Sequence, residues 1–288
     1  MTLRLACSDF AFPLLEHDRV LDLIAALEIP GVDIGVFGGR SHLGPERIMS
    51  NIPKAATELR LKMQERGLQV ADIFLIPGGF DTLAPNHPDA AERSRSRDLF
   101  QRILEFTVRC NATHMTCLPG IAWQQEPLDS SLKRSSEELA WRIEQAKQVG
   151  VAFAVEPHLG SIVPSPETVL HLLEMTPGLS VTLDYTHFTY QGIKDSAVEP
   201  LVAFASHFHA RCGAKSRPQV AFENNEIDYG RVIEAMKEYN YDGYIELEYV
   251  WIDWEHCNEV DNLSETIRLR DFFLQRISKR RTNGVQSV

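Results

Sequence analysis

Short apolar runs alternate along the chain with longer amphipathic stretches. Runs of about four to eight apolar residues are typical of strands that a parallel sheet buries on both faces. On this pattern we predict strands over residues 3–7, 32–36, 69–76, 113–118, 151–156, 180–184, 206–210 and 243–249.

The stretches between these runs carry apolar residues three and four positions apart, which is the spacing of one helix face. We predict helices over residues 14–28, 53–67, 88–109, 135–149, 165–175, 196–205, 229–239 and 262–277. Several have start or stop residues in the expected places. Pro53 opens one helix and Gly67 ends it, Gly150 ends another, and the sequences SSEEL and SPE are N-terminal signals.

Strict alternation of strand and helix predicts an α/β fold, a (β/α)₈ TIM barrel in one domain. We place the barrel over residues 1–278 and a C-terminal tail over 279–288. The alternative is an open doubly wound sheet, but no GxGxxG follows the first strand. The glycine-rich GVFGGRSHLG lacks the lysine of a phosphate loop, and we interpret it as a turn with positive φ.

Composition and charge disfavour several classes of protein. The chain has 288 residues, 44% of them hydrophobic, and a net charge of −11, which disfavours nucleic acid as a partner. No apolar run approaches the roughly 18 residues of a membrane span. The start MTLRLACSDFAFPLLEHD lacks the features of a signal peptide, and the five cysteines include no CxxC. We therefore expect a cytoplasmic protein without membrane association.

Four successive predicted strands end in side chains that bind metals or transfer protons. The fifth ends at Glu156, the sixth at Asp184, the seventh in HFHAR and the eighth in ELEY. Barrel active sites lie at the carboxyl ends of the strands, so these residues mark the candidate site.

Side-chain parity orders the last two strands, because residues two apart face the same side. His209 and Glu248 lie nearer the open face and are preferred as ligands, whereas His207 and Glu246 lie deeper. Glu246 stays the alternative ligand of the eighth strand. A buried carboxylate there would need a partner.

Three carboxylates and one imidazole form a mostly hard ligand set. It suits one divalent ion, Mn²⁺ or Mg²⁺ first, with Co²⁺ or Zn²⁺ open. Such an ion could hold two vicinal oxygens of a hydroxy-carbonyl compound and stabilise an enediolate. Carboxylates on its two sides could then remove and return protons.

Across nearly the whole chain the sequence resembles the xylose isomerase-like barrel superfamily, the group of sugar phosphate isomerases and epimerases and endonuclease IV-like proteins. The segments that carry the resemblance are VEPHLGS, VTLDYTHF, HFHARCGAK with IDYGRVIEAM, and YDGYIELEY. The resemblance implies that one metal is bound by Glu156, Asp184, His209 and Glu248. It also implies that Glu156 and Glu248 form the acid/base pair; the alternative is that they only bind metal.

The resemblance further implies two substrate contacts. His187, three residues after Asp184, is expected to touch substrate or metal. A basic residue after the histidine of the seventh strand is expected to contact substrate hydroxyls; we prefer Arg217, with Arg211 and Lys215 as alternatives. Weaker candidates are loop histidines and aromatic residues near this face, namely His42, His87, His158, Trp123, Tyr249, Trp251 and Trp254.

We therefore expect a metal-dependent isomerase or epimerase of a small sugar or related polyhydroxy carbonyl compound, in a family where homo-oligomers are common. A lyase or dehydratase acting on an inosose-type ketone uses the same first proton transfer and remains open. An endonuclease IV-type metallohydrolase is less favoured, because RPQVAFENNEIDYG contains none of the further histidine ligands.

Overall fold

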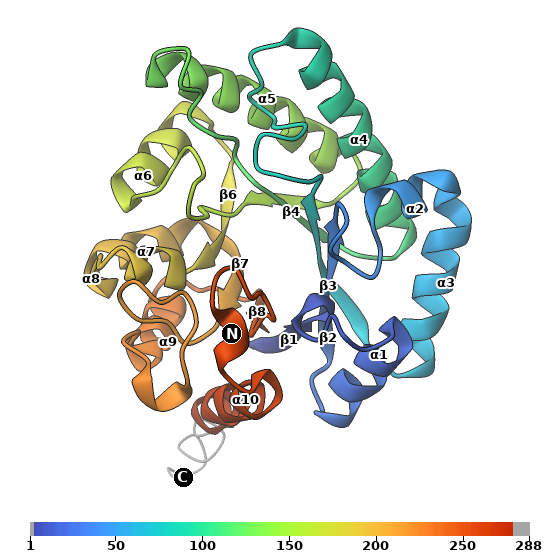
Figure 1. The fold of residues 1–288 in the computed structure, drawn as a ribbon, viewed down its shortest axis with the longest axis vertical. Coiled ribbons are helices and arrows are strands. Elements are labelled where there is room, and N and C mark those ends of the chain that lie inside the picture. Colours follow the sequence, from blue (N-terminus) through green and yellow to red (C-terminus); the bar gives the residue numbers. More distant parts are fainter. Residues whose placement is uncertain (1–2, 279–288) are drawn as a thin grey trace, which may run out of the picture.

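Eight parallel strands close into a barrel in the computed structural model, which describes residues 3–278 (Figure 1). Each strand pairs with the next, and the eighth pairs with the first. This confirms the predicted single-domain (β/α)₈ barrel; the predicted tail lies outside the described residues. The strands are β1 (Arg4–Ser8), β2 (Gly31–Phe37), β3 (Gln69–Ile76), β4 (His114–Cys117), β5 (Ala152–Val155), β6 (Ser180–Asp184), β7 (Ala205–Ala210) and β8 (Tyr244–Leu247).

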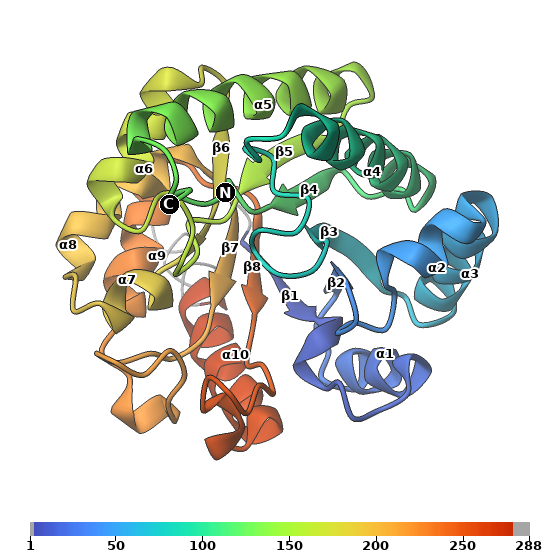
Figure 2. The ribbon, with the colours of Figure 1, turned by 45° about the horizontal axis from the view of Figure 1, so that its top comes forward.

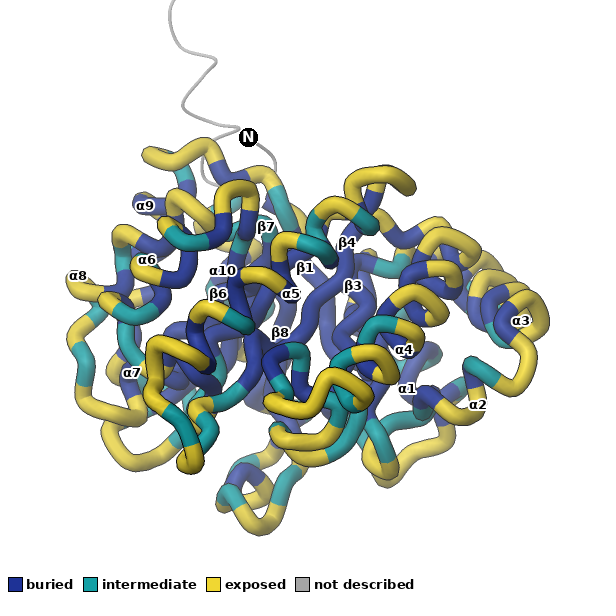
Figure 3. Tube along the Cα trace, turned by 90° about the horizontal axis from the view of Figure 1, so that it is seen from above, coloured by how far each residue is buried: buried dark blue, intermediate teal, exposed yellow. Residues whose placement is uncertain are grey.

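Helices surround the barrel, and their outer faces carry most of the exposed positions (Figures 2 and 3). They are α1 (His17–Ala26), α2 (Pro45–Ser50), α3 (Ile52–Glu65), α4 (Ala90–Arg109), α5 (Leu128–Gln148), α6 (Pro166–Met175), α7 (Thr186–Tyr190), α8 (Asp195–Val198), α9 (Tyr229–Glu238) and α10 (Asn262–Ser278). No helix within residues 3–278 combines the length and apolarity needed to cross a bilayer.

Three of the predicted helix signals cap or end their helices. Ser165 caps α6 in a reciprocal pair with Thr168, which satisfies otherwise free backbone groups. Gly67 and Gly150 follow α3 and α5 with φ of 66° and 72°, the left-handed conformation that glycine adopts without strain. These residues therefore end their helices as the sequence indicates.

Other boundaries differ from the prediction. Helix α5 begins at Leu128 rather than at SSEEL. Ser135 and Ser136 lie inside it and donate to backbone carbonyls of neighbouring segments, at 2.5 Å and 2.8 Å, instead of capping. The predicted helix over 196–205 is mostly a 3₁₀ segment (Glu199–Phe204), since Pro200 lacks an amide donor. Helix α1 starts at His17 rather than at residue 14, and the short α2 and α7 were not predicted.

The barrel interior contains a polar layer. Side chains of β2, β3, β4 and β7 meet there: Asp33 contacts His207, and His114 contacts both Asp72 on the neighbouring strand and Ser206. These residues, apart from the part-exposed Ser206, are buried. Interiors of such barrels are usually filled by branched apolar residues, so this polar layer needs a separate explanation.

Candidate functional site

The residues of the site stand at the carboxyl ends of β5 to β8. Backbone hydrogen bonds extend the pairing just past two of these strands: the amide of Glu156 donates to Cys117 at 3.0 Å, and that of Glu248 donates to Ala210 at 3.0 Å. Both glutamates therefore keep the in-and-out alternation of their strands. The structure brings them to the same end of the barrel as Asp184 and His209.

Glu156, His209 and Glu248 form a buried cluster whose ligand atoms all lie within 4.8 Å of one another. Nδ1 of His209 hydrogen-bonds Oε1 of Glu156 at 2.8 Å and lies 3.8 Å from Oε2 of Glu248. The other oxygen of Glu156 and Oε2 of Glu248 are buried without a hydrogen-bond partner. Buried carboxylates without partners are costly, so this donor set fits a divalent cation.

Asp184 lies beside this cluster and already has partners. Its carboxylate accepts from the amide and hydroxyl of Thr186, at 2.8 Å and 2.6 Å, and from Arg211 at 3.3 Å. Nε2 of His187 is 3.4 Å from Asp184 and 3.7 Å from Glu156. His187, in the first turn of α7, thus bridges the strand-six aspartate and the cluster.

His187 and His158 lie close together at the rim of the cluster, with ring centroids 3.9 Å apart and the rings tilted by 44°. Nδ1 of His158 donates to the Leu159 carbonyl at 2.7 Å, which leaves its Nε2 free. Burial would lower the pKa of His187, but the charges of Asp184 and Glu156 raise it. Burial also lowers the pKa of His158, to about 3, and nothing reverses that effect.

Deeper residues of β2 and β8 face the other side of His209. Nε2 of His209 is 3.6 Å from Asp33 and 4.0 Å from Glu246, whereas Nδ1 faces Glu156 and Glu248. The two strand-eight glutamates therefore lie on opposite edges of the same imidazole. This placement supports Glu248 as the ligand, which remains our prediction, and leaves Glu246 below the ring.

The two glutamates of the cluster differ in acidity. Burial raises the pKa of Glu248 to about 7, although the charges of Arg211 and His209 oppose it. Burial acts on Glu156 too, but the nearby His187 side chain, 3.7 Å away, and the hydrogen bond with His209 outweigh it and hold the pKa of Glu156 well below the usual range. Near neutral pH one carboxylate is ionised and the other is readily protonated, the condition for a base and an acid in one site.

Among the basic residues after β7, Arg211 is the one that reaches the cluster. Its side chain is buried and lies 3.3 Å from Asp184 and 3.8 Å from Glu248. Arg217 is 54% exposed, pairs with Glu259 at 3.1 Å and lines only the outer part of the cavity. Lys215 is exposed. Arg211 shares strand parity with His207 and His209, a signal that favours it over Arg217.

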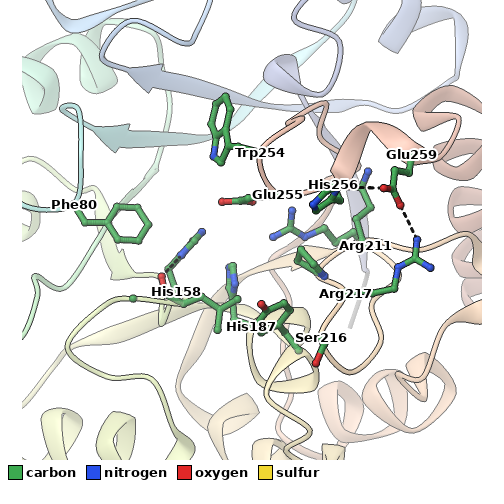
Figure 4. A pocket seen from close by; sticks show the side chains of 15 residues that line it. Phe80, His158, His187, Arg211, Ser216, Arg217, Trp254, Glu255, His256 and Glu259 are labelled. Atoms are coloured by element: carbon green, nitrogen blue, oxygen red, sulfur yellow. Dashed lines mark hydrogen bonds and ion pairs between the residues drawn. The ribbon is translucent and has the colours of Figure 1, made fainter.

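Two adjoining cavities of about 590 Å³ and 440 Å³ open above the cluster and share Phe80, His158 and Arg211. Figure 4 shows Trp254 on one side of the larger cavity and His187 on the other. The smaller cavity is also lined by aromatic side chains of the first strands, Phe10, Phe37 and Phe74. The space is thus polar on one side and apolar on the other.

The weaker candidates separate into cavity and packing residues. His42 stacks on His17 with centroids 5.0 Å apart, and His87 packs on Trp123 at 4.6 Å. Tyr249 is fully buried, and Trp251 lines a mostly apolar groove that shares Phe10, Phe37 and Trp254 with the smaller cavity. Of the aromatic candidates, Trp254 lines the main cavities.

Sequence reasoning missed Asp33, although a charged residue inside the run VDIGV marks an inward position.

The chain belongs to the xylose isomerase-like TIM barrel family, whose model matches residues 21–274. A search of curated proteins finds no match.

Solved structures share the fold at low identity. An L-ribulose 3-epimerase matches with a TM-score of 0.76 and 16% identity, over 99% of this chain and 98% of that chain. The IOLI protein with a bound zinc atom matches with a TM-score of 0.73 and 16% identity, over 96% and 99%. The probable 3-DHS dehydratase AsbF of Bacillus anthracis matches with a TM-score of 0.69 and 12% identity, over 93% and 99%.

Proposed function

We propose that this protein is a metal-dependent isomerase or epimerase of a small sugar or related polyhydroxy carbonyl compound. The observation that carries the proposal is the buried cluster of Glu156, His209 and Glu248, whose two carboxylates have opposite pKa shifts and face a common cavity. The structural similarity to an L-ribulose 3-epimerase supports the same class of reaction.

The metal would be held by Glu156, His209 and Glu248, with Asp184 as the fourth ligand on the side of Arg211. Mostly oxygen donors favour Mn²⁺ or Mg²⁺, and one imidazole leaves Co²⁺ and Zn²⁺ open. A bound divalent ion supplies Lewis-acid polarisation of a carbonyl and a neighbouring hydroxyl.

The side chains of the site divide the proton transfer between them. Glu156, ionised, accepts a proton from the carbon next to the substrate carbonyl. Glu248, whose carboxyl takes up a proton more readily than that of Glu156, returns one to the opposite face. Arg211 and His187 donate to substrate oxygens from the polar wall, while the aromatic wall excludes water.

The test is a screen of ketoses, inosose-type ketones and hydroxypyruvate in deuterium oxide with added Mn²⁺. NMR should show deuterium at the carbon next to the carbonyl together with the epimeric or isomeric product. Glu144→Gln is the control for losing one carboxylate, since Glu144 is exposed on α5 and lines neither cavity. Exchange that persists at the parent rate in metal-loaded Glu156→Gln and Glu248→Gln variants would overturn the proposed roles.

A lyase or dehydratase acting on an inosose-type ketone is the second candidate. It is favoured by the pKa of Glu248 of about 7, which suits protonation of a leaving hydroxyl, and by the aromatic wall, which suits one face of a ring. Mass spectrometry of the same reactions separates the two, because a dehydratase product is lighter by one water. Abasic DNA added to the screen tests the endonuclease IV-type hydrolase.

A further inference from the structure

The polar layer under the site contains a carboxylate aimed at the inner edge of the His209 ring. We propose that Asp33 is a positioning residue that holds His209 in the orientation in which Nδ1 binds the metal. This inference rests on the proposed function, because it assumes that His209 is a ligand.

The two ring nitrogens of His209 have different surroundings. Nδ1 points at Glu156 and Glu248, at 2.8 Å and 3.8 Å. Nε2 is buried without a hydrogen-bond partner, and Oδ2 of Asp33 lies 3.6 Å from it. A histidine that binds a metal through one nitrogen usually donates its other N–H to a carboxylate or carbonyl, which fixes ring and tautomer. Asp33 stands where that acceptor is required.

Asp33 is itself held in place from across the barrel. Its Oδ2 accepts from Nε2 of His207 at 2.5 Å, and both side chains are buried. The His209 ring is confined by His207, edge-on at 5.5 Å between centroids, and by Phe74 at 5.4 Å. A small closing movement would therefore bring Asp33 into hydrogen-bond distance of an already restricted ring.

Glu246 is the competing acceptor but is less well placed. Its nearest oxygen is 4.0 Å from Nε2 of His209, and neither oxygen has a hydrogen-bond partner. No partner therefore fixes its orientation, whereas His207 fixes that of Asp33. A longer side chain without an anchor cannot define the angle of the ring as sharply.

Asp72 provides a matched control. It lies in the same buried layer, on the next strand, and is also fully buried. Its oxygen accepts from Nδ1 of His114 at 2.7 Å, so its hydrogen bond serves another histidine. Asp72→Asn and Asp33→Asn thus remove the same charge from one layer, in which ligand atoms of Asp33, Asp72, His207 and His209 lie within 4.8 Å of one another. The two variants differ in the hydrogen bond that is lost, since Asp72 is bonded to His114 and Asp33 to His207.

The experiment measures Mn²⁺ affinity and stoichiometry directly, with free Mn²⁺ followed by electron paramagnetic resonance. Asp33→Asn should bind Mn²⁺ about 10–100-fold more weakly than the parent, the usual cost of losing such a partner. Asp72→Asn should bind close to the parent value even where its melting temperature falls. The visible spectrum of Co²⁺-loaded protein should change in Asp33→Asn alone.

If Asp33→Asn does not fold, His207→Leu and His207→Gln replace it. Leucine removes the donor that anchors Asp33 and should weaken Mn²⁺ binding, whereas glutamine restores a donor near the same place and should recover it. Parent-like affinity in His207→Leu would then contradict the positioning role.

Other outcomes overturn the inference in distinguishable ways. Equal losses of affinity in Asp33→Asn and Asp72→Asn would indicate a general effect on folding. A second Mn²⁺ equivalent removed by both variants would make Asp33 a ligand instead. If Glu156→Gln loses Mn²⁺ affinity but Asp33→Asn keeps it, only the positioning role of Asp33 is contradicted. If the parent protein itself binds no Mn²⁺, the proposed metal-dependent function is contradicted as well.

Discussion

The two halves of the barrel end in different side chains although their architecture is the same. The strand ends of β5 to β8 carry Glu156, Asp184, His209 and Glu248. Around the ends of β1 to β3 lie Phe10, Phe37 and Phe74, which form one apolar cluster with residues after β4 and β8. The comparison teaches that one wall of the cavity gathers the proposed acid, base and metal-binding groups, while the opposite wall is apolar and is suited to contact a substrate and exclude water.

The division between a polar and an apolar half also affects the stability of the protein. The polar half keeps several charged groups buried beside one another, which is tolerable only when charges of opposite sign are close. Arg211 and His209 supply positive charge among Glu156, Asp184 and Glu248. Changes in the polar half should therefore affect catalysis and charge balance, and changes in the apolar half should affect substrate affinity.

The largest effect is expected for Glu156→Gln. Glutamine keeps the shape of the side chain but cannot accept a proton, so turnover of metal-loaded protein should fall about 10²–10⁴-fold. Metal content must be measured in each sample, because an amide is a poorer ligand. Glu144→Gln, outside both cavities, should keep turnover near that of the parent. A fully metallated Glu156→Gln variant with parent-like turnover would limit Glu156 to metal binding.

Arg211→Met should lower the stability of the protein, and the size of the loss should depend on whether metal is bound. It leaves Asp184 and Glu248 without their buried cation, so the free energy of unfolding should fall by about 3–5 kcal/mol. Added Mn²⁺ should restore part of the loss, since the ion supplies positive charge to the same carboxylates. Denaturant titrations with and without Mn²⁺ measure this.

Arg142→Met is the control for that experiment. Arg142 is 2% exposed and pairs with Glu138 at 3.2 Å, outside the candidate site. Its loss should destabilise the protein to the same extent with and without Mn²⁺. If Mn²⁺ rescued neither variant or both equally, the charge of Arg211 would not be linked to the metal site.

Phe37→Leu should change substrate affinity more than turnover. The Phe37 ring packs on Phe10 and Phe74, with centroids 4.8 Å and 5.3 Å away, and lines the smaller cavity. Loss of apolar contact of this size should raise KM about tenfold and leave kcat nearly unchanged. Phe100→Leu, in α4, should lower stability without changing KM. An equal fall of kcat in Phe37→Leu would contradict the division between the two walls.

The smallest effect concerns pH and His158. Burial lowers its pKa to about 3, below the value of roughly 6.5 expected in the unfolded chain. Between these values the unfolded chain binds a proton that the folded protein does not. The contribution of His158 to stability is therefore complete above pH 6.5 and falls as pH drops, by at most about 1.4 kcal/mol per unit.

His158→Asn removes this pH-dependent contribution to stability, while the asparagine amide can still donate to the Leu159 carbonyl. The stability difference between parent and variant should shrink when denaturant titrations are moved from pH 7 to pH 5. His256→Asn, at a side chain that is 78% exposed, should show no such trend. A difference for His158→Asn that stays constant over this range would contradict the prediction.

Periodicity in the sequence was enough to predict the barrel, because each strand and helix is specified by its own neighbours along the chain. Apolar runs gave β3 and β6 their exact bounds, and alternation placed the ligand-type residues at the open end. Helix starts were less predictable: Ser135 and Ser136 resemble a cap, yet their hydroxyls bond to distant carbonyls. A local signal fails when tertiary partners compete for the same donor.

Only the tertiary structure decided how the site is charged and supported. Asp33 and His207 are separated by 174 positions along the chain and meet only because the barrel closes. Arg211 rather than Arg217 reaches Asp184 because the path of the chain after β7 turns one inward and the other to solvent. Burial raises the pKa of Glu248, whereas histidines of α7 and β7 lower that of Glu156. These pKa shifts and contacts depend on distances between strands, which cannot be read from the order of residues along one strand.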